Sequence, residues 1–320
     1  MRSTNDIQNP VFIAGYPRSG TTLLYRFLAG FREFGVNLPD QGETDRAFEP
    51  AVWFFSDPTT DLNKVYAQEW PHWKDAIPDS ELFKQHVVRY SELGHTRVWW
   101  EKQLNRRVFH NPRASPWLRT VSCHLSRRRQ IVRNFLTLYA QSYQAQRPLD
   151  KCPDNYKIFH ELRAIFPQAR FLFIYRHPLD VYSSMIRRAR AELQLADVIP
   201  IGKVAWLFIT PEEFAEGWLE AFNCATEFSK VAPKQLLMVR YEDFTNNRER
   251  EAQRICEFLD LNPQSIEFSQ NVSYDASRKF PLVSATPVPN SNKWQGYLHP
   301  SDINKITSMC AEALAELHYQ

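Results

Sequence analysis

The sequence predicts an α/β protein in which a central parallel sheet is flanked by helices. Short apolar runs alternate with segments of helical periodicity, which is the order typical of a parallel sheet. The runs show little alternation between apolar and polar positions, as expected for strands buried on both faces. The predicted strands are VFIAG at 11–15, FLFIY at 171–175 and QLLMVR at 235–240.

The first predicted helix, residues 21–30, directly follows the first strand and places Leu23, Leu24, Phe27 and Leu28 on one face. A long helix is predicted at 211–231, because Pro211 and the two acidic residues after it suit a first helical turn. Its apolar face consists of Phe214, Trp218, Phe222, Ala225 and Phe228. Further helices are predicted at 157–166, 179–190, 248–259 and 302–318.

We expect a single domain over residues 1–320, interrupted by one insertion. Residues 48–150 are helical in pattern and hold six of the nine tryptophans, so we expect a cap there that builds the acceptor side of a site. Residues 274–296 are rich in Pro, Ser and Asn and are predicted to form a long, lid-like loop.

The composition is that of a soluble globular protein, with 43% hydrophobic and 23% charged residues. A net charge of +3 lacks the basic excess typical of nucleic-acid binding. The five cysteines are scattered without a C-x-x-C pair, so we expect reduced thiols in a cytoplasmic protein and no zinc site. No apolar run reaches the roughly 20 residues of a membrane span, and the first ten residues show no signal peptide.

The stretch GYPRSGTTLL, residues 15–24, has the frame of a phosphate-binding P-loop, but Thr21 stands where that loop has lysine. The loop follows a strand and opens a helix, so backbone N–H groups from Ser19 to Thr22 can bind an anion. Gly20 allows close approach of the backbone, and the hydroxyls of Ser19, Thr21 and Thr22 add donors. Arg18 supplies positive charge inside the loop. The fold is therefore expected to be a P-loop-type three-layer fold.

A second anion site is predicted at the end of FLFIY. P-loop NTPases often have a metal-binding Asp after a buried strand, whereas Arg176 follows this one and Ser184 lies eight residues later. In the alternative interpretation, Arg176 pairs with Asp180 and Ser184 only packs. Two anion sites without a metal ligand suit a nucleotide with two separate phosphate groups, such as 3′-phosphoadenosine 5′-phosphosulfate (PAPS).

These segments resemble the sulfotransferase superfamily. YPRSGTT (16–22) is similar to its 5′-phosphosulfate loop, and FLFIYRHPLDVYSSM (171–185) to its 3′-phosphate strand and helix. VRYEDF (239–244) resembles a structural signature of the same superfamily. The arginine in the loop is closer to the branch that includes the tyrosylprotein sulfotransferases than to the cytosolic aryl and steroid enzymes.

The resemblance implies further site residues. GETD (42–45) resembles a segment that carries a catalytic glutamate, which makes Glu43 the candidate base, with His110 and His124 as rivals. DKCPDN (150–155) and NKWQGY (292–297) resemble segments with functional lysines. Lys151, with Arg18, would then stabilise the transferred sulfonate, and Lys293 would contact the 5′ end of PAPS.

The function expected from this resemblance is PAPS-dependent sulfuryl transfer to the hydroxyl of a small molecule, a glycan or a phenol such as tyrosine, with no metal. Two alternatives stay open at this point: a P-loop small-molecule kinase, and a non-catalytic nucleotide-binding protein of the same fold. The sequence also leaves open whether the chain forms a homodimer. Arg187, Arg188 and Arg190 are expected to form a solvated helix face.

Overall fold

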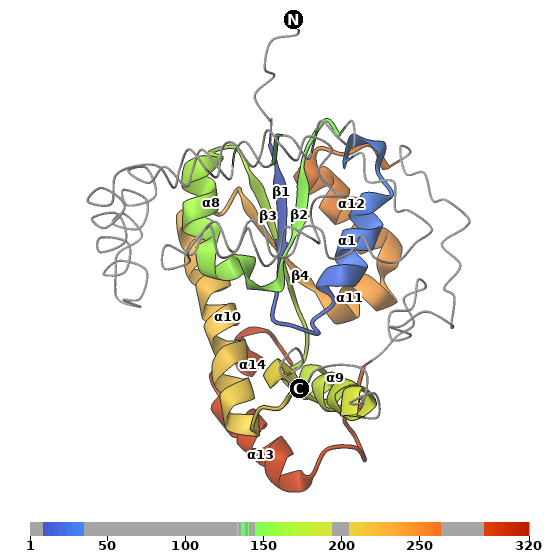
Figure 1. Cartoon of the computed structure of the whole chain (residues 1–320), viewed down its shortest axis with the longest axis vertical. Coiled ribbons are helices and arrows are strands. Elements are labelled where there is room, and N and C mark those ends of the chain that lie inside the picture. Colours follow the sequence, from blue (N-terminus) through green and yellow to red (C-terminus); the bar gives the residue numbers. More distant parts are fainter. Residues whose placement is uncertain are drawn as a thin grey trace, which may run out of the picture.

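The computed structural model describes residues 9–34, 145–193, 205–263 and 291–319, together with single positions 133, 136, 137 and 140. Within these residues, parallel strands form one four-stranded sheet in the order β2-β1-β3-β4 (Figure 1). The strands are β1 (Val11–Ala14), β2 (Leu149–Lys151), β3 (Arg170–Tyr175) and β4 (Leu236–Arg240). The parallel sheet that the apolar runs predict is therefore confirmed.

Helices cover both faces of the sheet, which confirms the three layers (Figure 1). One face carries α1 (Thr21–Ala29), α11 (Tyr241–Asn246) and α12 (Arg248–Leu259). The other face carries α8 (Phe159–Ile165) and α10 (Pro211–Val231). The core between the sheet and α8 and α10 is built from phenylalanines in edge contact, with ring centroids 5.0 Å apart between Phe159 and Phe171 and between Phe171 and Phe228.

The strand β2 corrects the predicted boundary of the aromatic insertion. Residues 149 and 150 were expected inside the helical interval 48–150, but Leu149–Lys151 is a strand whose first residue pairs with Val11 of β1. Two of its three residues are charged, so the local sequence does not predict a buried strand, and pairing with β1 decides it. Most of 48–150 lies outside the described residues, and its helical content stays a prediction.

The helix α10 begins and ends where the sequence predicts. Thr210 caps it: its hydroxyl accepts from the Glu213 N–H at 3.2 Å, and the Glu213 carboxylate accepts from the Thr210 N–H at 2.8 Å. This reciprocal capping box and Pro211 in the first turn fix the start. The predicted apolar stripe is buried along the whole helix.

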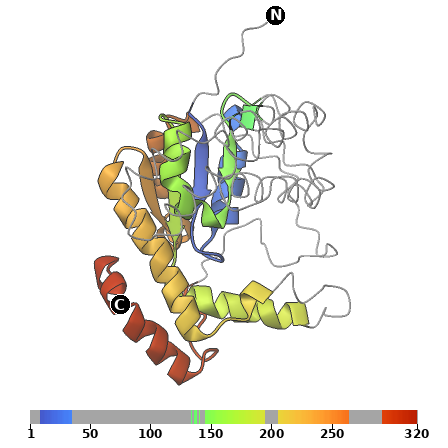
Figure 2. The same cartoon turned by 60° about the vertical axis from the view of Figure 1, so that its left-hand side comes forward.

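Beyond the carboxyl edge of the sheet lie α9 (Pro178–Leu193), α13 (Pro300–Met309) and α14 (Ala311–Glu316) (Figures 1 and 2). They share an apolar core that includes Leu179, Trp218, Ile306 and Leu314. The predicted helix 302–318 is in fact two helices, because the backbone leaves helical geometry at Cys310. The remaining elements are the short 3₁₀ turns η1 (Arg32–Phe34), η3 (Pro153–Ile158) and η5 (Ala205–Leu207).

All the strands are parallel, so their carboxyl ends meet at one edge of the sheet. Gly15, Lys151, Arg176 and Tyr241 each stand at or directly after a strand end on this edge. Ligands of open α/β sheets bind at this edge, where the loops leave the strands. The topology therefore brings the predicted anion-binding segments together.

Candidate functional site

The loop between β1 and α1 is held tightly against β3. A Cβ atom on Gly15 would stand 2.3 Å from the carbonyl oxygen of Ile174, so only glycine fits there. Gly20 caps α1 in a left-handed conformation with φ 109°, which is costly for any residue with a Cβ. The chain thus turns sharply out of the strand and directly into the helix.

The start of α1 presents donors and no acidic residue. The first backbone bond of the helix runs from the Leu24 N–H to the Gly20 carbonyl, so the N–H groups of Thr21 and Thr22 have no intrahelical acceptor. The expectation that the Ser19 N–H binds an anion needs correction, because it donates to the Tyr16 carbonyl at 3.0 Å. The Ser19 hydroxyl is fully buried and has no hydrogen-bond partner among the described residues.

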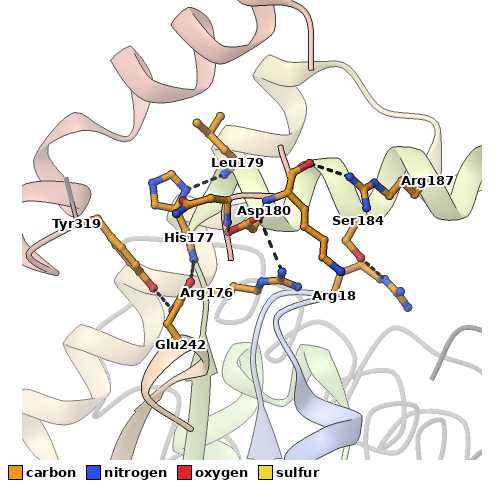
Figure 3. A network of polar contacts seen from close by, with 11 residues as sticks. Arg18, Arg176, His177, Leu179, Asp180, Ser184, Arg187, Glu242 and Tyr319 are labelled. Carbon is orange, nitrogen blue, oxygen red and sulfur yellow. Dashed lines mark hydrogen bonds and ion pairs between the residues drawn. The ribbon is translucent and has the colours of Figure 1, made fainter. Parts of the chain in front are cut away.

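Arg18 reaches across from this loop to α9. Its Nε donates to the Ser184 hydroxyl at 3.2 Å, which joins the two predicted anion sites (Figure 3). Burial, together with the nearby charges of Arg188 and Arg176, lowers the pKa of Arg18 to about 10. Arg18 therefore still carries its charge at neutral pH. Three positive side chains meet here: Arg18 from the loop, Arg176 from the end of β3 and Arg188 from α9.

Arg176 follows β3 and is only 4% exposed. Its guanidinium carbon lies 4.3 Å from the centroid of the Tyr241 ring, and its carbonyl accepts from the Trp218 indole N–H at 3.2 Å. One guanidinium nitrogen lies 4.0 Å from Oδ1 of Asp180. The ion pair of the alternative interpretation therefore exists, but Ser184 does not merely pack, since it accepts from Arg18.

Arg188 lies near the predicted anion sites, although the sequence predicts it on a solvated helix face. Arg188 is half-buried and stands one helical turn after Ser184 on α9, and its charge acts on Arg18. The expected solvated helix face is therefore wrong for Arg188. The exposed Arg187 also has a partner, donating to the Lys293 carbonyl at 2.7 Å. The four-residue spacing from Ser184 was the signal in the sequence that placed Arg188 on the same face.

The two predicted lysines lie in different surroundings. Lys151 ends β2, is 4% exposed and places its ammonium 3.5 Å from the Thr22 hydroxyl, so it belongs to the loop region. Lys293 is exposed, and its backbone N–H donates to Asp180 at 3.0 Å. The structure thus brings Arg18, Lys151 and the start of α1 together and ties the main chain of Lys293 to the Arg176 region.

The model of the sulfotransferase family matches residues 10–265. The chain belongs to the sulfotransferase family. No curated protein matches it in a comparison of sequences. Among solved structures, it is similar to the sulfotransferase domain from the curacin biosynthetic pathway, with 18% identity, a TM-score of 0.50 and coverage of 99% of both chains.

Two other similar structures are sulfotransferases as well. The sulfotransferase domain of the Synechococcus PCC 7002 olefin synthase has 18% identity and a TM-score of 0.47, with 97% of this chain and 98% of that one covered. The enzyme STF9 from Mycobacterium avium has 15% identity and a TM-score of 0.47, with 98% and 78% covered. These comparisons do not separate the branches of the family, so the resemblance to tyrosylprotein sulfotransferases stays a prediction.

Three candidate bases of this sulfotransferase, Glu43, His110 and His124, lie outside the described residues, and their roles stay predictions. Within the described ranges, no cluster of His, Cys, Asp and Glu is arranged to hold a metal ion. The helices that the structure describes include none that is both long and apolar enough to cross a membrane.

Proposed function

We propose that this sulfotransferase transfers the sulfuryl group of PAPS to an acceptor hydroxyl. The observation that carries the proposal is the contact between Arg18 and Ser184. It joins the loop that would hold the 5′-phosphosulfate to the helix that would hold the 3′-phosphate. A nucleotide with phosphate groups at both ends of its ribose would interact with both segments at once.

The residues around the loop suit the 5′-phosphosulfate. The start of α1 offers N–H groups and the positive end of the helix dipole, and no acidic residue opposes them. Thr22, the buried Ser19 hydroxyl and Lys151 add donors on the same side. The 3′-phosphate would be bound by Arg176, Ser184 and Arg188, since guanidinium groups form strong charge-assisted bonds with phosphate.

In the proposed reaction, the acceptor oxygen forms a bond to sulfur while the bond between sulfur and the bridging oxygen of the 5′-phosphate breaks. The acceptor proton passes to a base, for which Glu43 is the candidate, and adenosine 3′,5′-bisphosphate leaves. Arg18 and Lys151 would stabilise the negative charge that grows on the bridging oxygen and the sulfonate. Lys293 would contact the 5′ end of the donor.

The proposed acceptor is the hydroxyl of a small molecule, a glycan, or a phenol such as tyrosine, as the resemblance implies. The aromatic interval 48–150, in which we place the acceptor pocket, is largely outside the described residues. A cytoplasmic location is part of the proposal, and it is supported by Cys152, Cys256 and Cys310, which carry free thiols.

Calorimetry tests the donor. We expect tight binding of adenosine 3′,5′-bisphosphate and weak binding of ATP with Mg²⁺. The opposite result would favour a small-molecule kinase and refute the proposal. A screen of acceptors with labelled PAPS then tests turnover, and Glu43→Gln should abolish transfer while the bisphosphate still binds. Binding without any transfer would indicate a non-catalytic nucleotide-binding protein.

A further inference from the structure

The carboxylate of Asp180 contacts groups on two sides of the site. Asp180 lies in the first turn of α9 and is only 2% exposed. Its Oδ1 stands 4.0 Å from Arg176 and accepts from the Lys293 backbone N–H at 3.0 Å. Its Oδ2 accepts from the Asn292 backbone N–H at 2.9 Å. Figure 3 shows Asp180 between the labelled residues of this network.

A buried carboxylate is costly unless hydrogen bonds and an opposite charge compensate it. Asp180 has both, and they come from parts of the chain more than 100 residues apart, because Asn292 and Lys293 follow it by 112 and 113 positions. The Lys293 peptide is held from its other side as well, since Arg187 donates to its carbonyl. The main chain at Lys293 is therefore fixed by two side chains of α9.

We propose that Asp180 is a positioning residue that fixes Arg176 and the main chain of Lys293 relative to each other, so that one carboxylate sets both ends of the donor site. The inference rests on the proposed donor, in which Arg176 binds the 3′-phosphate and Lys293 contacts the 5′ end. In this proposal Asp180 would act through Arg176 and Lys293 and would not contact the nucleotide itself. Its removal would therefore weaken contacts at both ends, although the ligand loses no direct partner.

The substitution Asp180→Asn separates this role from a purely structural one. The amide keeps a single acceptor oxygen and loses the charge, so it cannot serve Arg176 and both backbone donors as the carboxylate does. Arg187→Ala is the matched partner, because it removes the bond to the Lys293 carbonyl and the contact with the Tyr297 ring but leaves the contact between Asp180 and Arg176 in place. Glu212→Gln is the control, since it converts a carboxylate to an amide in an exposed ion pair with Lys305.

The experiment is calorimetry with adenosine 3′,5′-bisphosphate, adenosine 3′-monophosphate and adenosine 5′-monophosphate. We expect Asp180→Asn to weaken the binding of both monophosphates about tenfold, because a displaced Arg176 or Lys293 would lose most of the energy of one charge-assisted bond. Arg187→Ala should weaken the 5′-monophosphate several-fold and leave the 3′-monophosphate unchanged. Glu212→Gln should match the wild type for all three ligands.

The outcomes are distinguishable. If the wild type binds none of the nucleotides, the proposed function fails and this inference with it. If the wild type binds but Asp180→Asn retains wild-type affinity for either monophosphate, only the positioning role is refuted. A lower melting temperature with unchanged affinities would indicate a structural role alone. If circular dichroism shows that Asp180→Asn does not fold, Arg187→Ala is the deciding variant. Unchanged affinity of Arg187→Ala for the 5′-monophosphate would then overturn the inference.

Discussion

The ring of Tyr241 lies so close to Gly20 that a Cβ atom on residue 20 would stand 2.6 Å from its Cδ2. The same ring stacks with Arg176 through a cation–π contact. Tyr241, the first residue of α11, therefore connects the loop after β1 to the arginine after β3. Through this ring, the VRYEDF segment contacts both of the predicted anion-binding segments.

Replacement of Gly20 by alanine should disturb the loop severely. The left-handed backbone costs an L-residue about 1–2 kcal/mol, and the Tyr241 ring is too rigid to move aside easily. We expect a lower melting temperature and at least about tenfold weaker binding of adenosine 3′,5′-bisphosphate. Gly296→Ala controls for backbone strain in the melting experiment, since Gly296 has φ 71° and open space around it. Equal losses of stability in the two variants would contradict the contact argument.

The variant Lys151→Met tests whether Lys151 acts on the transferred group. Its buried ammonium lies beside Thr22 at the start of α1. We expect kcat for sulfuryl transfer to fall about 100-fold, the typical loss of one charge-stabilising donor, while bisphosphate affinity changes far less. Lys157→Met is the control, because Lys157 pairs with Asp154 at 3.0 Å in a partly exposed ion pair. Parallel losses of turnover and binding would instead assign Lys151 to ground-state binding.

The variant Arg188→Ala should weaken bisphosphate binding. We expect about a tenfold loss, because a guanidinium beside a phosphate contributes a charge-assisted bond. The salt dependence of binding should fall too, and calorimetry at two ionic strengths measures both effects. Arg190→Ala is the control on the same helix, since Arg190 is exposed and covers the ring of Tyr297. Unchanged affinity in Arg188→Ala would remove this residue from the site.

The buried carboxyl of Asp150 predicts a pH dependence of stability. Burial raises its pKa from 3.8 to about 7, although the Asn155 amide donates to it at 2.7 Å. Between these values the folded state holds a proton that the unfolded state has lost, so stability falls as pH rises from about 4 to about 7. The loss is on the order of a few kcal/mol.

In Asp150→Asn this dependence should disappear. Urea denaturation at pH 5 and pH 8 measures it, and the difference between the two should be smaller in the variant than in the wild type. The same fall in both proteins would show that another group titrates.

Local patterns in the sequence were sufficient for most of the fold. The buried runs predicted β1, β3 and β4, and the capping residues and apolar stripe fixed both ends of α10. The loop of residues 15–24 was also predictable from the sequence, because glycines and hydroxyl residues at these spacings after a strand are typical of a P-loop. The strand β2 was not predictable from the sequence, because its three residues adopt the strand conformation by pairing with β1.

The sequence by itself determined that a loop rich in glycine and hydroxyl residues follows one buried strand and that an arginine follows another, and the resemblance of these segments predicted the family that the family model confirms. Only the tertiary structure decided that Arg18 donates to Ser184 and that Arg188 lies near Arg18. It also decided that Asp180 accepts a hydrogen bond from the Lys293 backbone. The physical reason is distance along the chain. Periodicity and turn chemistry act over a few residues, whereas these contacts join segments that meet only when parallel strands end at one edge.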